Sequence, residues 1–154
     1  MTRILVDTGP LVSLIDSSEA QHGWACEQLA SLRPPLYTCE AVIAKAVYLL
    51  ASAQLDATAP LDLIARGVLR IHFDLAAECA SVRALIARYA PRMDLADACL
   101  VRMTELERDS RVLTLDGDFR IYRRDGRHVV PVIMPAVASP PKARAARRRA
   151  RRRR

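Results

Sequence analysis

Short apolar segments of strand character alternate with helix-like segments along the first 135 residues, and this alternation limits the possible folds most. Strands are expected over 3–6, 36–37, 68–73, 111–115 and 129–133. The last of these contains Pro131, which places it at the edge of a sheet. Strands that alternate with helices are typical of α/β proteins with a largely parallel sheet, so the sequence predicts that fold class.

Capping and stop signals define the expected helices. Thr38, Asp74 and Asp94 stand where a side chain caps the helix that follows, and Pro60 suits a first helical turn. Gly67 is well placed to end a helix. We expect helices over 11–15, 20–31, 38–53, 60–66, 75–89 and 95–108.

The charge divides the chain into two unequal parts. A length of 154 residues corresponds to about one domain, and a hydrophobic fraction of 51% excludes a chain that is disordered throughout. The formal net charge is +7, yet residues 139–154 alone carry nine positive charges and no acid. The preceding 138 residues therefore carry a net charge of −2. We predict one domain over 1–135 and a disordered basic extension over 136–154.

Dense positive charge of this kind binds phosphate backbones without base specificity. The candidate nucleic-acid-binding residues are Lys142, Arg144, Arg147, Arg148, Arg149, Arg151, Arg152, Arg153 and Arg154. Two other interpretations stay open: a solubilising extension, and an arm that reaches an acidic pocket of the same chain.

Several classes of protein are excluded or disfavoured. No apolar run approaches the ~20 residues that span a bilayer, and the N-terminus lacks signal-peptide features, so we expect a cytoplasmic protein without membrane contact. The four cysteines and three histidines have no zinc-site spacing, and we expect the cysteines to be reduced and buried. No glycine-rich phosphate loop is present, which disfavours a small-ligand α/β protein. Any chemistry must come from carboxylates.

Five aspartates fall where an α/β sheet places ligand-binding groups. Asp7 and Asp116 each follow a predicted strand, and ligands bind beyond the carboxyl ends of such strands. Asp94 and Asp97 share one face of a helix start, and Asp118 is close to Asp116. Converging carboxylates repel one another, and a hard divalent ion such as Mg²⁺ relieves that repulsion. The same residues also suit structural roles as a helix cap, a turn and a polar strand end.

Four segments in order resemble the PIN domain family, which includes the toxin nucleases of toxin–antitoxin modules. They are Ile4-Leu-Val-Asp-Thr-Gly9, the stretch over 36–50, Pro91-Arg-Met-Asp-Leu-Ala-Asp-Ala98, and Leu113-Thr-Leu-Asp-Gly-Asp-Phe119. The resemblance covers about residues 3 to 134. It implies a three-layer α/β/α fold with a mostly parallel central sheet and a site that cleaves RNA with Mg²⁺ or Mn²⁺.

The resemblance also implies roles for individual residues. Asp7, Asp97 and Asp116 match the family's catalytic and metal-binding acids, and Asp118 matches a further metal ligand. The supporting residues are Asp94, Thr8 and Thr114, the last two with hydroxyls that can bond the carboxylates. A small antitoxin protein as partner and a homodimer are implied by the resemblance alone.

Lys45 departs from the family pattern. The family has a glutamate in the long helix, where this chain reads Ile43-Ala-Lys-Ala-Val47. With Asp7, Asp97 and Asp116, a glutamate gives a cluster charge of −4, whereas Lys45 gives −2. Glu40 lies five residues earlier, about 140° around the helix, so it does not replace the missing acid.

Two functions follow from these observations. The first is a metal-dependent endoribonuclease of the toxin type, with activity weakened by Lys45. The alternative is a catalytically impaired PIN-like module that binds RNA or a partner protein. The sequence defines neither the RNA target nor the partner.

Overall fold

A five-stranded parallel sheet forms the centre of the computed structural model, which describes residues 1–136. The predicted basic extension and its nine candidate nucleic-acid-binding residues lie outside the described residues, apart from Ala136. The strand order is β3-β2-β1-β4-β7, and every neighbouring pair is parallel. The strands are β1 (Arg3–Val6), β2 (Leu36–Thr38), β3 (Leu69–Ile71), β4 (Ser110–Leu113) and β7 (Val132–Ile133).

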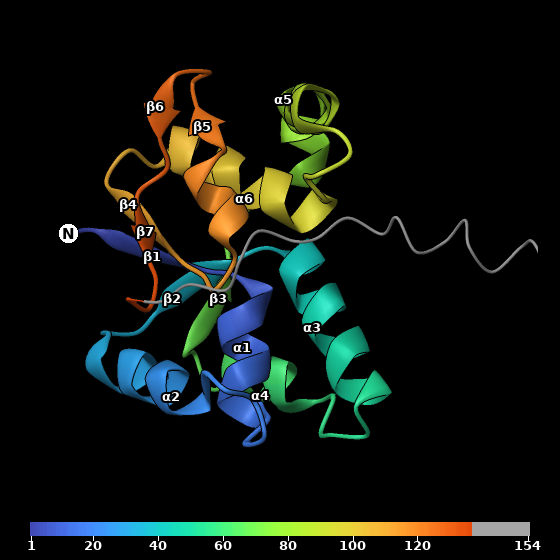
Figure 1. The fold of residues 1–154 in the computed structure, drawn as a ribbon, viewed down its shortest axis with the longest axis vertical. Coiled ribbons are helices and arrows are strands. Elements are labelled where there is room, and N and C mark those ends of the chain that lie inside the picture. Colours follow the sequence, from blue (N-terminus) through green and yellow to red (C-terminus); the bar gives the residue numbers. More distant parts are fainter. Residues whose placement is uncertain (137–154) are drawn as a thin grey trace, which may run out of the picture.

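Helices cover both faces of this sheet (Figure 1). Helices α5 and α6 lie on one side, and α1, α2 and α4 lie on the other, while α3 contacts α1 and α4 as well as α6. The bounds are α1 (Thr8–Ile15), α2 (His22–Ser31), α3 (Glu40–Ser52), α4 (Ala59–Ala65), α5 (Leu75–Tyr89) and α6 (Leu95–Leu106). The predicted α/β class with a mostly parallel sheet is therefore confirmed.

The core is mainly aliphatic, since burial on both faces requires strands that are apolar throughout. Val6, Val112 and Leu113 are fully buried at the β1–β4 pair, and Leu100 packs from α6. Val6 is in register with Leu113, so the two central strands end at the same edge of the sheet.

None of the helices within residues 1–136 is both long and apolar enough to cross a membrane.

Several sequence-based boundaries differ from the structure, and at two places the difference changes which element a residue belongs to. Thr38 ends β2 instead of capping a helix, and Cys39 takes the N-cap position of α3. The Thr38 hydroxyl donates to the carbonyl of Val6 on the neighbouring strand at 2.9 Å, a tertiary contact that the local sequence does not reveal. The segment predicted as one strand over 129–133 contributes to two sheets, and its edge position is confirmed for β7.

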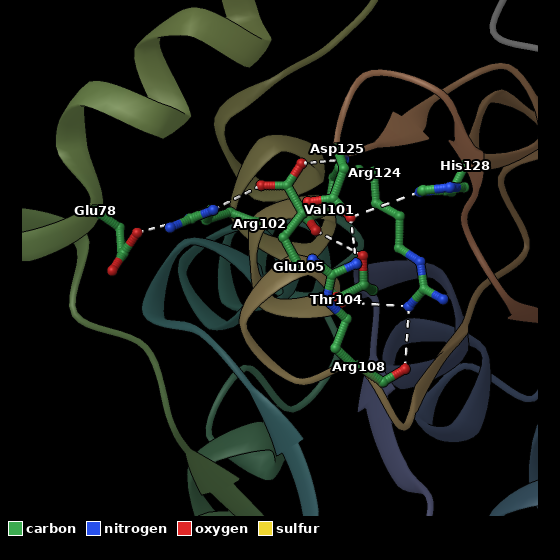
Figure 2. Close-up of polar contacts among 9 residues, drawn as sticks. All are labelled: Glu78, Val101, Arg102, Thr104, Glu105, Arg108, Arg124, Asp125 and His128. Carbon is green, nitrogen blue, oxygen red and sulfur yellow. Dashed lines mark hydrogen bonds and ion pairs between the residues drawn. The ribbon is translucent and has the colours of Figure 1, made fainter.

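A small antiparallel hairpin of β5 (Arg123–Arg124) and β6 (His128–Val129), which the sequence did not predict, is anchored on α6 (Figure 2). Arg124 donates to the carbonyls of Thr104 and Arg108 at 3.3 and 3.1 Å. The amide of Asp125 donates to Glu105 at 2.8 Å. These bonds hold strand β5 and the turn that follows it against α6.

The start of α5 offers a test of local helix capping. Asp74 Oδ1 accepts a hydrogen bond from the Ala77 amide at 3.1 Å, as the sequence predicted. We expect Asp74→Ala to lower the free energy of unfolding by about 1 kcal/mol, because the amide loses its partner. Urea unfolding at neutral pH measures this, with Asp74→Ser as a control that retains a capping oxygen. Equal stability of the alanine and wild-type proteins would contradict the cap.

Candidate active site

Asp7 lies at the point where β1 ends and α1 begins. Its Oδ1 accepts the amide of Thr8 at 2.7 Å, which makes it the N-cap of α1, and its Oδ2 accepts the hydroxyl of Thr114 at 2.7 Å. The second bond exists because β1 and β4 are paired in register, so the residue after Leu113 stands beside the residue after Val6. Asp7 is only 4% exposed, and a buried carboxylate needs such donors.

Burial raises the pKa of the Asp7 carboxyl above its usual range. The hydrogen bonds from Thr114 and Thr8 and the positive charge of Lys45 act in the opposite direction, and the charge of Asp116 adds to the increase. Asp7 therefore lies within electrostatic range of both Lys45 and Asp116.

Asp116 and Asp118 follow β4 in a turn that is stabilised by the side chains of Thr114 and Asp116. The Asp116 amide donates to the Thr114 hydroxyl at 3.0 Å, and the Asp118 amide donates to Asp116 Oδ1 at 3.0 Å. Asp116 thereby caps a short 3-10 helix, η1 (Gly117–Arg120). Thr114 thus links Asp7 and the Asp116 turn through one hydroxyl.

Asp94 and Asp97 form a capping box at the start of α6. Asp94 Oδ1 accepts the Asp97 amide at 2.9 Å, and Asp97 Oδ2 accepts the Asp94 amide at 3.4 Å. The structural role predicted for Asp94 as an N-cap is therefore present. Asp97 is 1% exposed, while Asp94 is partly exposed, and its Oδ2 oxygen takes no part in the capping box.

That second oxygen binds Lys45. Lys45 Nζ lies 2.6 Å from Asp94 Oδ2, so α3 is joined to the start of α6 by an ion pair. Lys45 also lines a cavity of about 330 Å³ together with Asp7, Thr8 and Asp116. Glu40 stands exposed in the first turn of α3 and is not among the residues that line this cavity.

Three contributors to this region were missed by the sequence reasoning. The Tyr122 hydroxyl donates to Asp97 Oδ2 at 3.0 Å, and Arg92 Nη1 donates to the fully buried Asp118 at 2.8 Å. Burial, followed by the negative charge of Asp97, raises the pKa of Tyr122, so the phenol keeps the proton that it donates. Glu19 lines the cavity from the loop between α1 and α2.

The predicted site residues fall into two adjoining groups. Asp7, Thr8, Lys45 and Asp116 line the cavity. Asp94, Asp97, Thr114 and Asp118 do not line it, and they contact the first group or its supports through the hydrogen bonds described above.

Comparison with known proteins identifies the family. The sequence pattern that defines the PIN domain family matches residues 4–125 of this chain. The chain belongs to the PIN domain family. Among solved structures, this PIN domain is similar to VapC20 of Mycobacterium tuberculosis, described as a sarcin–ricin loop cleaving toxin.

The similarity to VapC20 has a TM-score of 0.67 and a sequence identity of 24%, and it covers 83% of this chain and 99% of that chain. At this identity the likeness shows the fold. No curated protein sequence matches this PIN domain.

The carboxylates of this PIN domain provide the oxygen donors that a hard divalent ion prefers. Within residues 1–136, however, no three His, Cys, Asp or Glu side chains are arranged as ligands of one ion. The ammonium of Lys45 stands beside Asp94 and within electrostatic range of Asp7, and Arg92 neutralises Asp118. Two side-chain cations compensate two of these acids, so a divalent ion would have to compete with Lys45 and Arg92 for the carboxylates.

The role of Thr114 in this PIN domain can be tested by removing its hydroxyl. Thr114→Val preserves the shape of the side chain but leaves buried Asp7 Oδ2 without its donor and the Asp116 amide without its acceptor. We expect the free energy of unfolding to fall by about 1–3 kcal/mol, measured by urea unfolding. Thr114→Ser retains the hydroxyl and serves as the control. If the valine variant matches the wild type, Thr114 does not support Asp7.

Proposed function

We propose that this PIN domain is an endoribonuclease of the toxin type, which hydrolyses RNA phosphodiesters with an activity attenuated by Lys45. The observation that carries the proposal is the position of Lys45, whose Nζ lies 2.6 Å from Asp94 in the wall of a cavity that also contains Asp7 and Asp116. Membership of the PIN domain family supports the nuclease assignment.

The proposed catalytic residues are Asp7, Asp97 and Asp116. Hydrogen bonds hold both carboxylate oxygens of Asp7 and the Oδ2 oxygen of Asp97, so the two side chains have fixed positions. These residues would hold a Mg²⁺ or Mn²⁺ ion, which would supply an activated water and charge stabilisation for phosphodiester hydrolysis. Lys45 weakens that chemistry because an ammonium replaces a carboxylate ligand and pairs with Asp94.

The proposed partners follow from charge and family. RNA is the proposed substrate, and the basic extension over 136–154 supplies the attraction that an acidic cavity lacks. A small antitoxin protein and a homodimeric state are proposed from the family resemblance, together with a location in the cytoplasm.

A second candidate function is a PIN module that binds RNA or a partner without efficient cleavage. The same ion pair favours it, because Lys45 and Arg92 already neutralise two of the acids. Cleavage assays separate the two functions directly.

Restoring the acid at position 45 tests the proposal. We expect Lys45→Glu to raise Mn²⁺-dependent cleavage of single-stranded RNA at least about tenfold, because a carboxylate ligand replaces a cation. Lys45→Met is the matched control, since it removes the positive charge without supplying an oxygen. Titration calorimetry with Mn²⁺ alone gives a second readout, in which Lys45→Glu binds at least about tenfold more tightly than the wild type.

The outcomes are distinct. An equal gain in Lys45→Met and Lys45→Glu assigns the effect to charge alone and removes the ligand argument. If cleavage does not increase in either variant, the alignment of Lys45 with the family's glutamate is wrong. Cleavage that persists in Asp7→Asn overturns the assignment of this carboxylate. RNA binding without cleavage in every variant supports the second candidate function.

The basic extension predicts a strong salt dependence of RNA binding. Replacing the four arginines at 151–154 by glutamine should weaken binding and reduce the slope of log affinity against log salt by up to about 3, at ~0.7 per phosphate contact with a single strand. Fluorescence anisotropy with labelled single-stranded RNA at several salt concentrations measures the slope.

A control of equal charge change comes from the body of the protein. Arg66, Arg70, Arg83 and Arg127 are all exposed, and replacing these four by glutamine lowers the net charge by the same amount. If the body variant and the extension variant change the slope equally, the extension has no special part in RNA binding.

A further inference from the structure

A second cavity lies between the sheet and the helices α5 and α6, apart from the candidate active site. Its volume is about 490 Å³, and among residues 1–136 it shares no lining residue with the cavity that contains Asp7 and Asp116. Leu5 lines it from β1, Tyr37 from β2 and Met103 from α6. Cavities of about 300 to 1,000 Å³ with mainly apolar walls are typical of small-molecule sites.

The second cavity is open to solvent. Helix α5 packs against α6 and has few contacts with the strands, so part of the sheet stays uncovered on this side. Met103 is buried, whereas His72 and Leu106 in the same lining are exposed. A ligand can therefore enter from the surface without opening the core.

Arg3 shows which chemistry the second cavity favours. Its guanidinium carbon lies 5.0 Å from the centroid of the Tyr37 ring. Its Nη1 lies 2.9 Å from Glu107 Oε2 and 3.2 Å from His72 Nε2. A cation over an aromatic face is attracted by the ring, and the carboxylate adds to this attraction. The lining of the second cavity thus already holds one guanidinium of the chain itself.

Acidic side chains outnumber basic ones in this lining. With histidine counted as neutral, the described residues that line it carry three negative charges and one positive charge, from Asp74, Glu78, Glu107 and Arg3. Glu78 also pairs with Arg102, which does not line the cavity and is shared with Glu105 (Figure 2). Arg102 therefore cannot compensate both of its acids. The excess of negative charge disfavours a phosphate or carboxylate ligand and favours a cation.

Two of the carboxylates have an oxygen left for a ligand. Asp74 Oδ1 caps α5, and Glu78 Oε2 accepts from Arg102 Nε at 2.6 Å. Within residues 1–136, no hydrogen bond or ion pair occupies the second oxygen of either carboxylate. Phe73, the residue before Asp74, also lines the cavity and provides an aromatic surface.

We propose that the second cavity binds a small organic cation, with an ammonium or amidinium group on an aromatic or apolar body. The carboxylates of Asp74 and Glu78 accept the N–H donors of the cation, and Phe73 and the apolar walls contact its body. This inference does not depend on the proposed nuclease function, because the second cavity has its own lining and its own charge.

Tryptamine is the probe for this site, and indole-3-acetate, with the same ring and the opposite charge, is its control. Binding is measured on the full 154-residue chain from NMR shifts of the backbone amides. We expect tryptamine to bind at least about tenfold more tightly than indole-3-acetate. The amides that shift should be those of 71–74 and 103–107, and not those of 7–9 and 115–116 at the candidate active site.

A cation placed in the wall of the second cavity tests the same point. Leu106 lines this cavity and is 52% exposed, whereas Leu61 on α4 is 51% exposed and lies outside the lining. Leu106→Lys should weaken tryptamine binding at least about tenfold, and Leu61→Lys should leave it unchanged. Asp74→Asn keeps a capping oxygen but loses the charge, so binding should weaken about two- to fivefold. Asp62→Asn, at another exposed aspartate, is its control.

Four results would overturn the proposal. They are equal affinities for tryptamine and indole-3-acetate, shifts confined to the candidate active site, no binding at tryptamine concentrations up to about 10 mM, and equal effects of Leu106→Lys and Leu61→Lys. If Leu106→Lys does not fold, Asp74→Asn and the shifts of the wild-type chain decide the question.

Discussion

The hydrogen bond between Thr114 and Asp7 is the contact on which the arrangement of the site depends. It forms because β1 and β4 are neighbours in register and end at one edge of the sheet. The same threonine hydroxyl accepts the Asp116 amide, so one side chain connects the first strand, the first helix cap and the turn after β4. The buried Asp7 carboxylate is therefore held by the pairing of the two central strands, and a loss of register would leave it without its donor.

Charge compensation is the second principle of this site. Five aspartates gather at one edge of the sheet, and the protein supplies two cations of its own, Lys45 on Asp94 and Arg92 on Asp118. Each cation comes from outside the strand ends: Lys45 from the middle of α3, and Arg92 from the segment before α6. The two ion pairs neutralise two of these acids within the folded chain itself, and the proposed function therefore depends on Lys45 of α3.

The convergence of Asp7, Thr114 and Asp116 could be predicted because strand ends in a parallel sheet share an edge. Predicting that Lys45 lies beside them also required the resemblance to the PIN domain family, which places a glutamate at this position. Tyr122 and Arg92 could not be predicted, because their positions depend on long-range contacts. Tyr122 is set by the hairpin that Arg124 and Asp125 anchor on α6. The prediction that Thr38 caps a helix was wrong for a similar reason, because its hydroxyl bonds a carbonyl on another strand, and local sequence does not reveal such a contact.

Asp94 serves two neighbours at once, since one oxygen caps α6 and the other binds Lys45. The two contacts are therefore linked equilibria on a single carboxylate. Any molecule that competes for Lys45 returns the full negative charge of Asp94 to the positive end of the α6 dipole, where an anion is favourable. A ligand that binds in the cavity and contacts Lys45 would therefore also change the stability of α6. Such a ligand would change the free energy of unfolding of the whole domain.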